Sequence, residues 1–453
     1  MAIMILLMVF FFLTRLPNLL ILPIFADEAI YIRWAQLINS GQIFIPLTDG
    51  KTPLFMWLLA PLLYLGFDPL ITGRMLSVFS GLSLMLGVYF FTQVIFNRKI
   101  AILSSILVIF QPFILFYDRL SLTDSLLTSL IVWSAYFLLK NHWALNLTSV
   151  SAFLVKPSAI SFLLALGCLL IIKPQNWKKL GLAGLLTVLV YNLFRLSDSF
   201  RLISQRSSDY LRPLSLSNFS QTALTLFNWL ISYFHWPFFL IFFVVVVLAI
   251  KNKNRKILSL LLFILIPFCL QAAIGKILYP RYLLPLAPFL LIIFSWGIRQ
   301  FKFGLILILL FFLSWLKFDF LILTDPIKAP FHPAEKEQYL TSWASGRGLK
   351  EIKAYLMNLP KDQKIVVATE GSFGTLPNGL QIYFPNDSNI QILGVGFPKT
   401  TVSPEMEKAL AQGKFLYLVA NRNRYNLSEL NRLKLISEYS RPGGETLVFY
   451  AVY

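Results

Sequence analysis

The residues best suited to chemistry lie where a long apolar stretch ends. Residues 1–25 are almost entirely apolar, and Asp27 and Glu28, the first acidic residues of the chain, follow directly. Carboxylates at the end of a spanning helix are costly and usually functional, and such a group can take a proton from a nucleophile. Asp124, which begins a later apolar stretch, offers a second group that could orient the first. Helix capping is the alternative interpretation, because acidic residues at helix starts favour the helix dipole.

Basic residues accompany these carboxylates. Lys51 follows the pair along the chain, and Lys276 and Arg281 flank Tyr279. Such side chains could simply extend along helix ends towards water. Binding of a phosphate is the functional alternative, because lysine supplies a point charge and arginine a bidentate fork. We expect a donor phosphate to be held by Lys51, Lys276, Arg281 and Arg201.

Membrane helices must position these groups. The chain of 453 residues is 57% apolar and contains 42 Phe, and its mean hydropathy is +0.70, which excludes a soluble globule of this size. The net charge of +19 does not indicate a nucleic-acid partner, because the excess lies in the apolar part. Residues 1–323 hold 25 Lys and Arg against 9 Asp and Glu, whereas residues 324–453 hold 15 against 12. We therefore expect a polytopic membrane protein in the plasma membrane.

The charges of the loops predict the topology. Lys156 and Pro157 interrupt the apolar residues 143–172, which could form one kinked helix or two short ones. With the N-terminus in the cytoplasm, two helices place the basic cluster 251–256 inside, as the positive-inside rule requires, and one helix places it outside. We therefore expect eleven spans and an external C-terminus. The other apolar runs able to cross about 30 Å of hydrocarbon lie near 1–23, 72–96, 101–117, 124–139, 180–195, 227–250, 257–274, 282–298 and 303–322.

This topology gathers charge on one side of the membrane. Nearly every carboxylate of the membrane region faces outwards, together with several cations, which predicts a shared polar cavity that opens to the outside. The residues concerned are Asp27, Glu28, Asp49, Lys51, Asp68, Asp118, Asp124, Lys156, Asp198, Asp209, Lys276 and Arg281.

The chain divides into two expected domains. Residues 1–323 form the membrane domain, whose large outer loops are residues 26–71, with helices lying on the membrane surface, and residues 196–223. Residues 324–453 have the composition of a soluble domain, and with an external C-terminus we expect a small extracytoplasmic α/β domain. Its patterns predict a helix at Gly348–Leu359, buried strands at Lys364–Glu370 and Phe415–Ala420, and a hairpin of Lys434–Ser440 with Thr446–Tyr453.

A glycine-rich segment, Glu370–Gly379, follows the first of these strands. Its spacing is neither that of a dinucleotide fingerprint nor that of a phosphate-binding loop. A structural turn is the expectation, with a lip that binds an acceptor as the alternative.

Several short motifs resemble those of a known family. Their order along the chain and their expected side of the membrane are similar to those of the GT-C glycosyltransferases that use polyprenyl-phosphate sugars. The similarity is greatest to the protein O-mannosyltransferases of glycosyltransferase family 39 and to the lipid A aminoarabinose transferases. The resemblance extends to about residue 323, although Thr52 stands where the family often has proline. The segments that carry it are Arg15–Leu19, Asp27–Tyr31, Lys51–Leu54 with Trp57, Asp124 and Arg281–Pro285.

The resemblance implies a role for each matching residue. Asp27 would be the general base that deprotonates the acceptor, and Glu28 and Asp124 would support it or contact the sugar or the acceptor. Lys51 would hold the donor phosphate, and Arg281 would contact the lipid phosphate. Further contacts to the sugar or the acceptor are expected from Tyr31, Trp57 and Tyr279.

No cofactor is expected to be required. A single phosphate leaving group can be stabilised by cations instead of a metal, and the three histidines, His142, His235 and His332, do not predict a histidine-rich metal site. One divalent ion held by Asp27 and Asp124 remains an alternative.

The sequence thus predicts a glycosyltransferase that moves a hexosyl or pentosyl group, with inversion, from a polyprenyl-phosphate donor to an extracytoplasmic protein, lipid or glycan. A secondary transporter is one alternative, although it would predict ionisable residues in mid-span and inverted repeats. A membrane-anchored scaffold that acts through residues 324–453 is the other.

Overall fold

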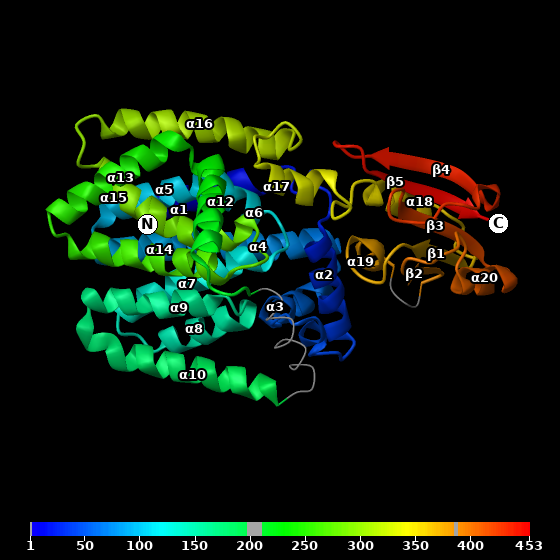
Figure 1. The fold of residues 1–453 in the computed structure, drawn as a ribbon, viewed down its shortest axis with the longest axis horizontal. Coiled ribbons are helices and arrows are strands. Elements are labelled where there is room, and N and C mark those ends of the chain that lie inside the picture. The colour runs from blue at the N-terminus through cyan, green and yellow to red at the C-terminus, as the bar shows by residue number, and fades with distance from the viewer. Residues whose placement is uncertain (1, 197–210, 385–387) are drawn as a thin grey trace. The chain divides into compact units, whose positions relative to one another are not determined.

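The computed structural model describes residues 2–196, 211–384 and 388–453 (Figure 1). The chain forms two compact units, and each is assembled from segments that are distant in sequence. The first unit comprises Met1–Leu19, Gln42–Leu58 and Arg74–Phe331, and the second comprises Leu20–Gly41, Leu59–Gly73 and His332–Tyr453.

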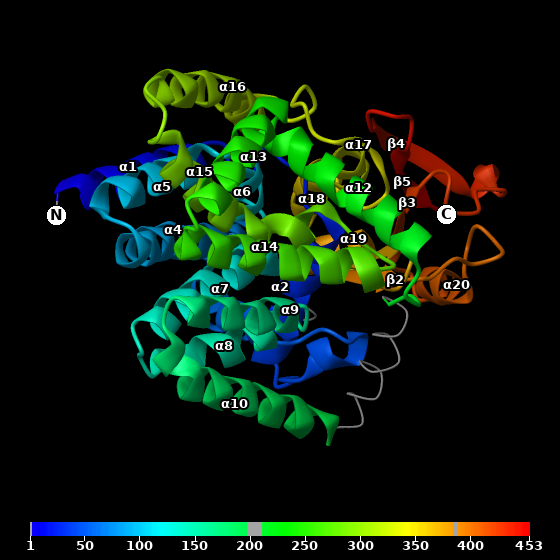
Figure 2. The same cartoon turned by 60° about the vertical axis from the view of Figure 1, so that its left-hand side comes forward.

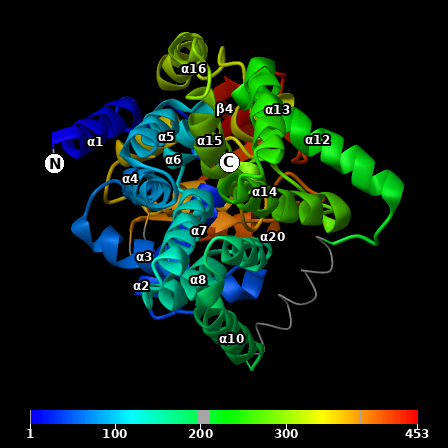
Figure 3. The ribbon, with the colours of Figure 1, turned by 90° about the vertical axis from the view of Figure 1, so that its left-hand side faces the viewer.

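Helices dominate the membrane part of the chain. Helices α7, α8 and α9 lie side by side, and α10 runs along α8 (Figures 1 and 2). Figure 3 shows α7, α8 and α10 from another side. The helices are α1 (Ala2–Arg15), η1 (Ile45–Asp49), α3 (Leu54–Leu62), α4 (Pro69–Ile95), α5 (Arg98–Phe110), α6 (Pro112–Asp118), α7 (Thr123–Leu139), α8 (Ala144–Val155), α9 (Ala159–Ala165), η3 (Leu166–Ile171), η4 (Pro174–Asn176), α10 (Trp177–Arg195), α12 (Leu216–Phe234), α13 (Trp236–Lys251), α14 (Arg255–Ile274), η5 (Pro280–Leu286), α15 (Ala287–Ile298) and α16 (Gly304–Thr324).

Several of these helices can span a membrane. In the described residues, four segments are long and apolar enough, namely α4, α14, Pro280–Ile298 and Ile306–Thr324. Two bent pairs also pass when each pair is taken together: α5 with α6, bent by 62°, and α12 with α13, bent by 109°. The runs expected as single spans near 101–117 and 227–250 are therefore broken. The chain is an integral membrane protein, and the total of eleven spans stays a prediction.

The first helix is shorter than expected. The apolar run suggested a span over residues 1–23, but α1 ends at Arg15. Pro17 explains the end, because proline disfavours the helical conformation in the residue before it. Asn18 then adopts a positive φ of 49°. This turn brings the chain to the segment that contains Asp27.

The second unit contains a five-stranded mixed sheet in the order β2-β1-β3-β5-β4. Strands β2, β1 and β3 are parallel, whereas β5 runs antiparallel to both β3 and β4. Its elements are α2 (Ala26–Asn39), η2 (Leu63–Leu65), α17 (Pro333–Lys336), η6 (Glu337–Thr341), α18 (Leu349–Met357), β1 (Ile365–Thr369), α19 (Thr375–Gln381), β2 (Ile390–Gly394), α20 (Pro404–Ala411), β3 (Phe415–Asn421), η7 (Leu430–Arg432), β4 (Leu433–Ser440) and β5 (Thr446–Val452).

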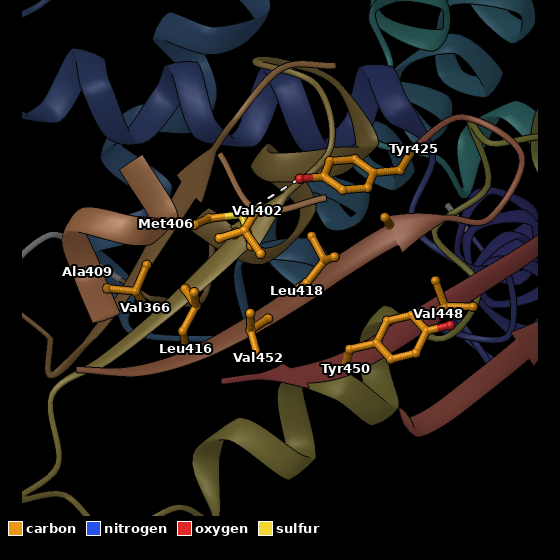
Figure 4. Close-up of a cluster of buried hydrophobic side chains, with 12 residues drawn as sticks. Val366, Val402, Met406, Ala409, Leu416, Leu418, Tyr425, Val448, Tyr450 and Val452 are labelled. Atoms are coloured by element: carbon orange, nitrogen blue, oxygen red, sulfur yellow. Dashed lines mark hydrogen bonds between the residues drawn. The ribbon is translucent and has the colours of Figure 1, made fainter. Parts of the chain in front are cut away.

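The two faces of this sheet are covered by different helices. Met406 of α20 belongs to a cluster with Leu416, Leu418 and Val448, which point to one face (Figure 4). Tyr417, the residue between the two leucines, points to the other face, where Tyr355 of α18 packs on it with 6.2 Å between ring centroids. Alternation along a strand explains this, because successive side chains point to opposite faces.

The predicted fold class, a helical membrane bundle followed by a small α/β domain, is confirmed. The expected helix and strands of the C-terminal part correspond to α18, β1, β3, β4 and β5. Strand β2 and helices α19 and α20 were not predicted. Strand β2 is an edge strand of five residues that begins directly after Ser388 and Asn389, so its pattern is weak.

Candidate active site

A buried ion pair lies at the start of α7. Asp124 is the second residue of this helix, and its carboxylate is almost inaccessible, with 2% of the residue exposed. Lys156 lies in the turn between α8 and α9, and its Nζ donates a hydrogen bond to Asp124 Oδ1 at 2.9 Å. The packing of α7 against α8 and α9 brings the two residues together. Pro157, which cannot donate to the helix ladder, helps to open the turn.

More positive charge surrounds this pair. Lys156 Nζ lies 4.0 Å from the centroid of the Tyr282 ring, in η5. Asp124 attracts the Lys156 ammonium, whereas the charges of Arg281 and Lys51 repel it. Arg281 and Lys51 therefore lie within electrostatic range of Lys156, which is bonded to a buried carboxylate. Such a cluster favours an anion such as phosphate, which relieves the repulsion between the cations.

Aromatic rings hold the arginine of this cluster. Arg281 is 7% exposed, and its guanidinium carbon lies 4.8 Å from the Tyr279 ring centroid and 5.9 Å from that of Tyr282. The two rings pack edge to face at 5.7 Å. Stacking against aromatic faces stabilises a partly desolvated guanidinium, so Tyr279 and Tyr282 fix the position of the charge. Tyr279, expected to contact substrate, thus contacts Arg281.

A second buried ion pair supports the start of α7. Arg15 at the end of α1 and Asp118 at the end of α6 are both fully buried, and both Nε and Nη2 of Arg15 lie 3.2 Å from Asp118 Oδ2. Asp118 Oδ1 accepts a hydrogen bond from Ser125 Oγ at 2.9 Å. Arg119 donates to the carbonyl oxygens of Pro17 and Asn18, each at 2.8 Å. These contacts fix the backbone beside Asp124.

Trp57 contacts other residues of the protein, whereas Lys276 is exposed. Trp57 Nε1 donates to the carbonyl oxygen of Ile43 at 2.9 Å, and its ring packs edge to face on Phe44. Lys276 is exposed, and in the described ranges it shows no hydrogen bond or ion pair. Arg201 lies outside the described residues.

The first acidic pair belongs to α2, in the second unit. Glu28 is fully buried, and its Oε2 accepts a hydrogen bond from the backbone N–H of Phe25 at 2.9 Å. This bond caps the start of α2, as the capping interpretation of the sequence proposed. Asp27 is half-buried in the same first turn. Tyr31, one turn further on, is buried against Trp34 with 6.1 Å between ring centroids.

No group of three or more His, Cys, Asp or Glu residues that could hold a metal ion occurs in the part of the chain that the structure describes. Asp124 already has an ammonium group as its partner, so any cation at that carboxylate competes with Lys156.

Lys156 is the residue of this cluster that sequence reasoning missed. It was placed on the outer side of the membrane but was given no role. The sequence did indicate an unusual position, because Lys156 and Pro157 interrupt the mostly apolar residues 143–172. A charge in such a position needs a partner, and Asp124 provides it.

Comparison with known proteins supports the fold assignment. The structure is similar to that of ArnT from Cupriavidus metallidurans bound to undecaprenyl phosphate, with a TM-score of 0.64 and 13% identity over 99% of this chain and 97% of that chain. The chain has the GT-C fold. A second match, at TM-score 0.54 and 12% identity, is the Archaeoglobus fulgidus oligosaccharyltransferase in complex with Zn and sulfate, with 92% of this chain and 68% of that chain covered.

The predicted GT-C resemblance is therefore confirmed at the level of the fold, and it covers the C-terminal part as well as the membrane part. A further structure, AglB from Archaeoglobus fulgidus with an inhibitory peptide and a dolichol-phosphate, matches at TM-score 0.50 and 11% identity over 93% of this chain and 69% of that chain. No family model matches the sequence, and no curated protein sequence matches it either.

Proposed function

We propose that this protein is a membrane glycosyltransferase that moves one sugar from a polyprenyl-phosphate donor to an acceptor outside the cytoplasm. The observation that carries the proposal is the buried pair of Lys156 and Asp124, with Lys51 and Arg281 in electrostatic range of Lys156, in a chain with the GT-C fold. Two proteins of similar fold hold undecaprenyl phosphate and a dolichol-phosphate. The N-terminus would lie in the cytoplasm, and the reaction would take place on the outer side of the plasma membrane.

The cation cluster can stabilise a phosphate leaving group. Transfer breaks the bond between the anomeric carbon and the phosphate oxygen, so negative charge builds up on the phosphate in the transition state. Cations fixed beforehand stabilise that charge without reorganisation. Arg281 offers two parallel N–H groups and Lys51 a point charge, while Asp124 keeps Lys156 charged and in place. Lys276 and Arg201 remain candidates for the same phosphate.

The acceptor needs a base. We assign this role to Asp27, in the first turn of α2, because the sequence resemblance matches it to the first aspartate of the family's Asp-Glu pair. It would take the proton of the acceptor as the acceptor oxygen or nitrogen attacks the anomeric carbon opposite the phosphate, which inverts that carbon in one step. Glu28 would stabilise the first turn of α2 through its hydrogen bond to Phe25. Asp124 would neutralise part of the positive charge of the cations. Tyr31 and Trp57 remain candidates for contacts to the sugar or the acceptor.

Incubation of the purified protein with labelled polyprenyl-phosphate sugars tests the proposal, with hexosyl and pentosyl donors compared. The expected result is label in an acceptor and release of polyprenyl phosphate.

Binding of undecaprenyl phosphate should weaken at least tenfold in Lys51→Ala and Arg281→Gln. Lys328→Ala is the matched control, because Lys328 is exposed and pairs with its neighbour Asp325. Equal lipid affinity in all three variants would overturn the assignment of the phosphate site.

A divalent ion is the alternative to catalysis by cations alone. If Asp124 holds such an ion, chelation should abolish transfer and added Mn²⁺ or Mg²⁺ should restore it. The contact between Lys156 and Asp124 favours transfer that persists in a chelator.

A further inference from the structure

The second unit contains a site of its own, at the carboxyl edge of its parallel strands. The chain runs from β1 to β2 on one side and then crosses to β3 on the other, because the strand order is β2-β1-β3. The direction of winding therefore reverses between β1 and β3. In open α/β sheets, ligands bind outside the carboxyl ends of the strands at such a point. Glu370 follows β1 there, and Asn421 ends β3.

A buried polar network forms the floor of this edge. The Glu370 carboxylate accepts hydrogen bonds from the Asn421 backbone N–H at 2.7 Å and from its side-chain amide at 2.6 Å. Asn421 Oδ1 in turn accepts from Arg441 at 2.6 Å, and Arg441 also donates to the carbonyl oxygen of Ser345. Glu370, Asn421 and Arg441 are each 3% exposed. A buried network whose members bond to one another is rigid, so the floor is fixed before any ligand binds.

Three exposed aromatic side chains lie near this floor: Trp343 and Phe397 pack on the neighbour of Glu370, Arg424, and Phe373 follows Glu370 in the chain and stacks on Trp34. Trp343, Phe373 and Phe397 expose 39%, 47% and 58% of their surface. The glycine-rich segment lies beside two of these rings: a Cβ at Gly374 would lie 3.7 Å from Trp343, and one at Gly371 would lie 4.0 Å from Phe397. Large apolar side chains that gather at an exposed edge favour a binding surface.

Arg424 lies between two of these rings. Its guanidinium carbon is 4.1 Å from the centroid of the Trp343 ring and 5.2 Å from that of Phe397. Its acidic neighbour is Glu370 at 3.7 Å, which is longer than a hydrogen bond. In the described part of the chain, the Arg424 guanidinium shows no hydrogen bond, and its side chain is 29% exposed. The oxygens of Glu370 are already bonded to Asn421, so the N–H donors of the Arg424 fork can still bind an acceptor.

We propose that Trp343, Phe373, Phe397 and Arg424, here called the aromatic-arginine edge, bind a pyranose that carries a carboxylate. The apolar face of the sugar ring packs on the aromatic side chains. The carboxylate accepts two parallel hydrogen bonds from the guanidinium. The site deepens the proposed function by naming the chemistry of a glycan acceptor, and its role as an acceptor site rests on that function.

Binding of tetragalacturonate to the full-length protein in detergent tests this site, with uncharged maltotetraose as the comparison. Titration calorimetry should show binding of the acidic sugar and at least tenfold weaker binding of the neutral one. Trp343→Ala and Arg424→Gln should each raise the Kd for tetragalacturonate at least tenfold. Phe415→Ala and Arg422→Gln are the matched controls: Phe415 is 52% exposed at the opposite end of β3, and Arg422 pairs with Glu438.

Three outcomes would overturn the site: absence of tetragalacturonate binding, equal binding of both sugars, or equal losses in the test and control variants. Undecaprenyl phosphate binding, measured in the same samples, separates this site from the proposed function. The aromatic-arginine variants should retain the lipid affinity of the unmodified protein. If the unmodified protein binds no lipid but binds the acidic sugar, the glycosyltransferase proposal fails and the sugar site stands.

Discussion

A carboxylate at the start of a helix can be a cap or a reactive group, and its partner distinguishes the two roles. Glu28 accepts the N–H of Phe25 and so performs a capping function. Asp124 occupies a similar position in α7, but its oxygen is bonded to the ammonium of Lys156. Two acidic residues with the same signal in the sequence thus have different chemical environments. The difference arises from a lysine that is 32 positions away in the chain, which no local pattern reveals.

Substitution of Asp124 should expose the repulsion between the cations. In Asp124→Asn the ammonium of Lys156 loses its negative partner while Arg281 and Lys51 remain nearby. Loss of one partner of a buried pair destabilises by about 2–3 kcal/mol at a site that water still partly reaches. We expect a lower midpoint of thermal unfolding in detergent. The double variant Asp124→Asn with Lys156→Met should recover part of the loss. Additive effects of the two substitutions would show that the pair is not coupled.

Asp27→Asn should abolish transfer and leave the protein folded. The amide cannot take a proton, and a general base contributes about 10²–10⁴-fold to a rate. Transfer from a labelled donor should therefore fall by at least about 100-fold, with unchanged expression and undecaprenyl phosphate binding. Asp325→Asn, at an exposed carboxylate that pairs with Lys328, is the control. Near-normal turnover of Asp27→Asn would exclude Asp27 as the base.

At the scale of elements, one ion pair connects three helices. Arg15 ends α1, Asp118 ends α6, and Ser125 in the first turn of α7 donates to Asp118. Arg15→Met should destabilise the protein by about 3–5 kcal/mol, because Asp118 would keep a buried charge without its cation. Arg15→Lys should restore part of this loss, since it keeps the charge but not the fork. Thermal unfolding measures both variants, and an unchanged midpoint for Arg15→Met would contradict this role.

Helix α4 approaches the same ion pair at a glycine. A Cβ at Gly81 would lie only 2.3 Å from Asp118 Cγ, closer than atoms can pack. Gly81→Ala should therefore displace Asp118 and destabilise the protein by about 1–3 kcal/mol. Gly184→Ala in α10 is the matched control, because a Cβ there meets nothing within 4 Å and alanine favours the helix. Equal unfolding midpoints for the two variants would show that Gly81 is not required.

The elements also show what the sequence could and could not predict. The hairpin of β4 and β5 was predictable because Arg441-Pro442-Gly443-Gly444 marks its turn. The 109° bend between α12 and α13 was not, because apolar residues continue on both sides of His235. His235 at the bend adopts a φ of 66°, an uncommon conformation for a residue other than glycine. The carboxylates and cations were predicted as types, whereas the pairing of Lys156 with Asp124 required the fold.

At the scale of the whole molecule, the helix that carries Asp27 belongs to the same unit as the C-terminal sheet. The backbone N–H of Ala26 donates to the carbonyl oxygen of Ala344 at 3.0 Å. The Phe25 ring lies 4.5 Å from that of Tyr339, between centroids. Gln36 donates to the carbonyl oxygen of Ile382 at 2.8 Å. The C-terminal part therefore holds α2 in place, and it cannot be removed without loss of the partners of this helix.

Truncation after Phe331 should consequently separate donor binding from transfer. Lys51, Lys156 and Arg281 all lie in the first unit, so the truncated protein should still bind undecaprenyl phosphate. Transfer should be lost, because α2 would lose every contact to residues 332–453 and would no longer hold Asp27 in one position. Tyr339→Ala, which removes the ring beside Phe25, should lower kcat in the same direction, whereas Phe415→Ala should not. Full transfer by a monodisperse truncated protein would show that α2 is positioned without the C-terminal sheet.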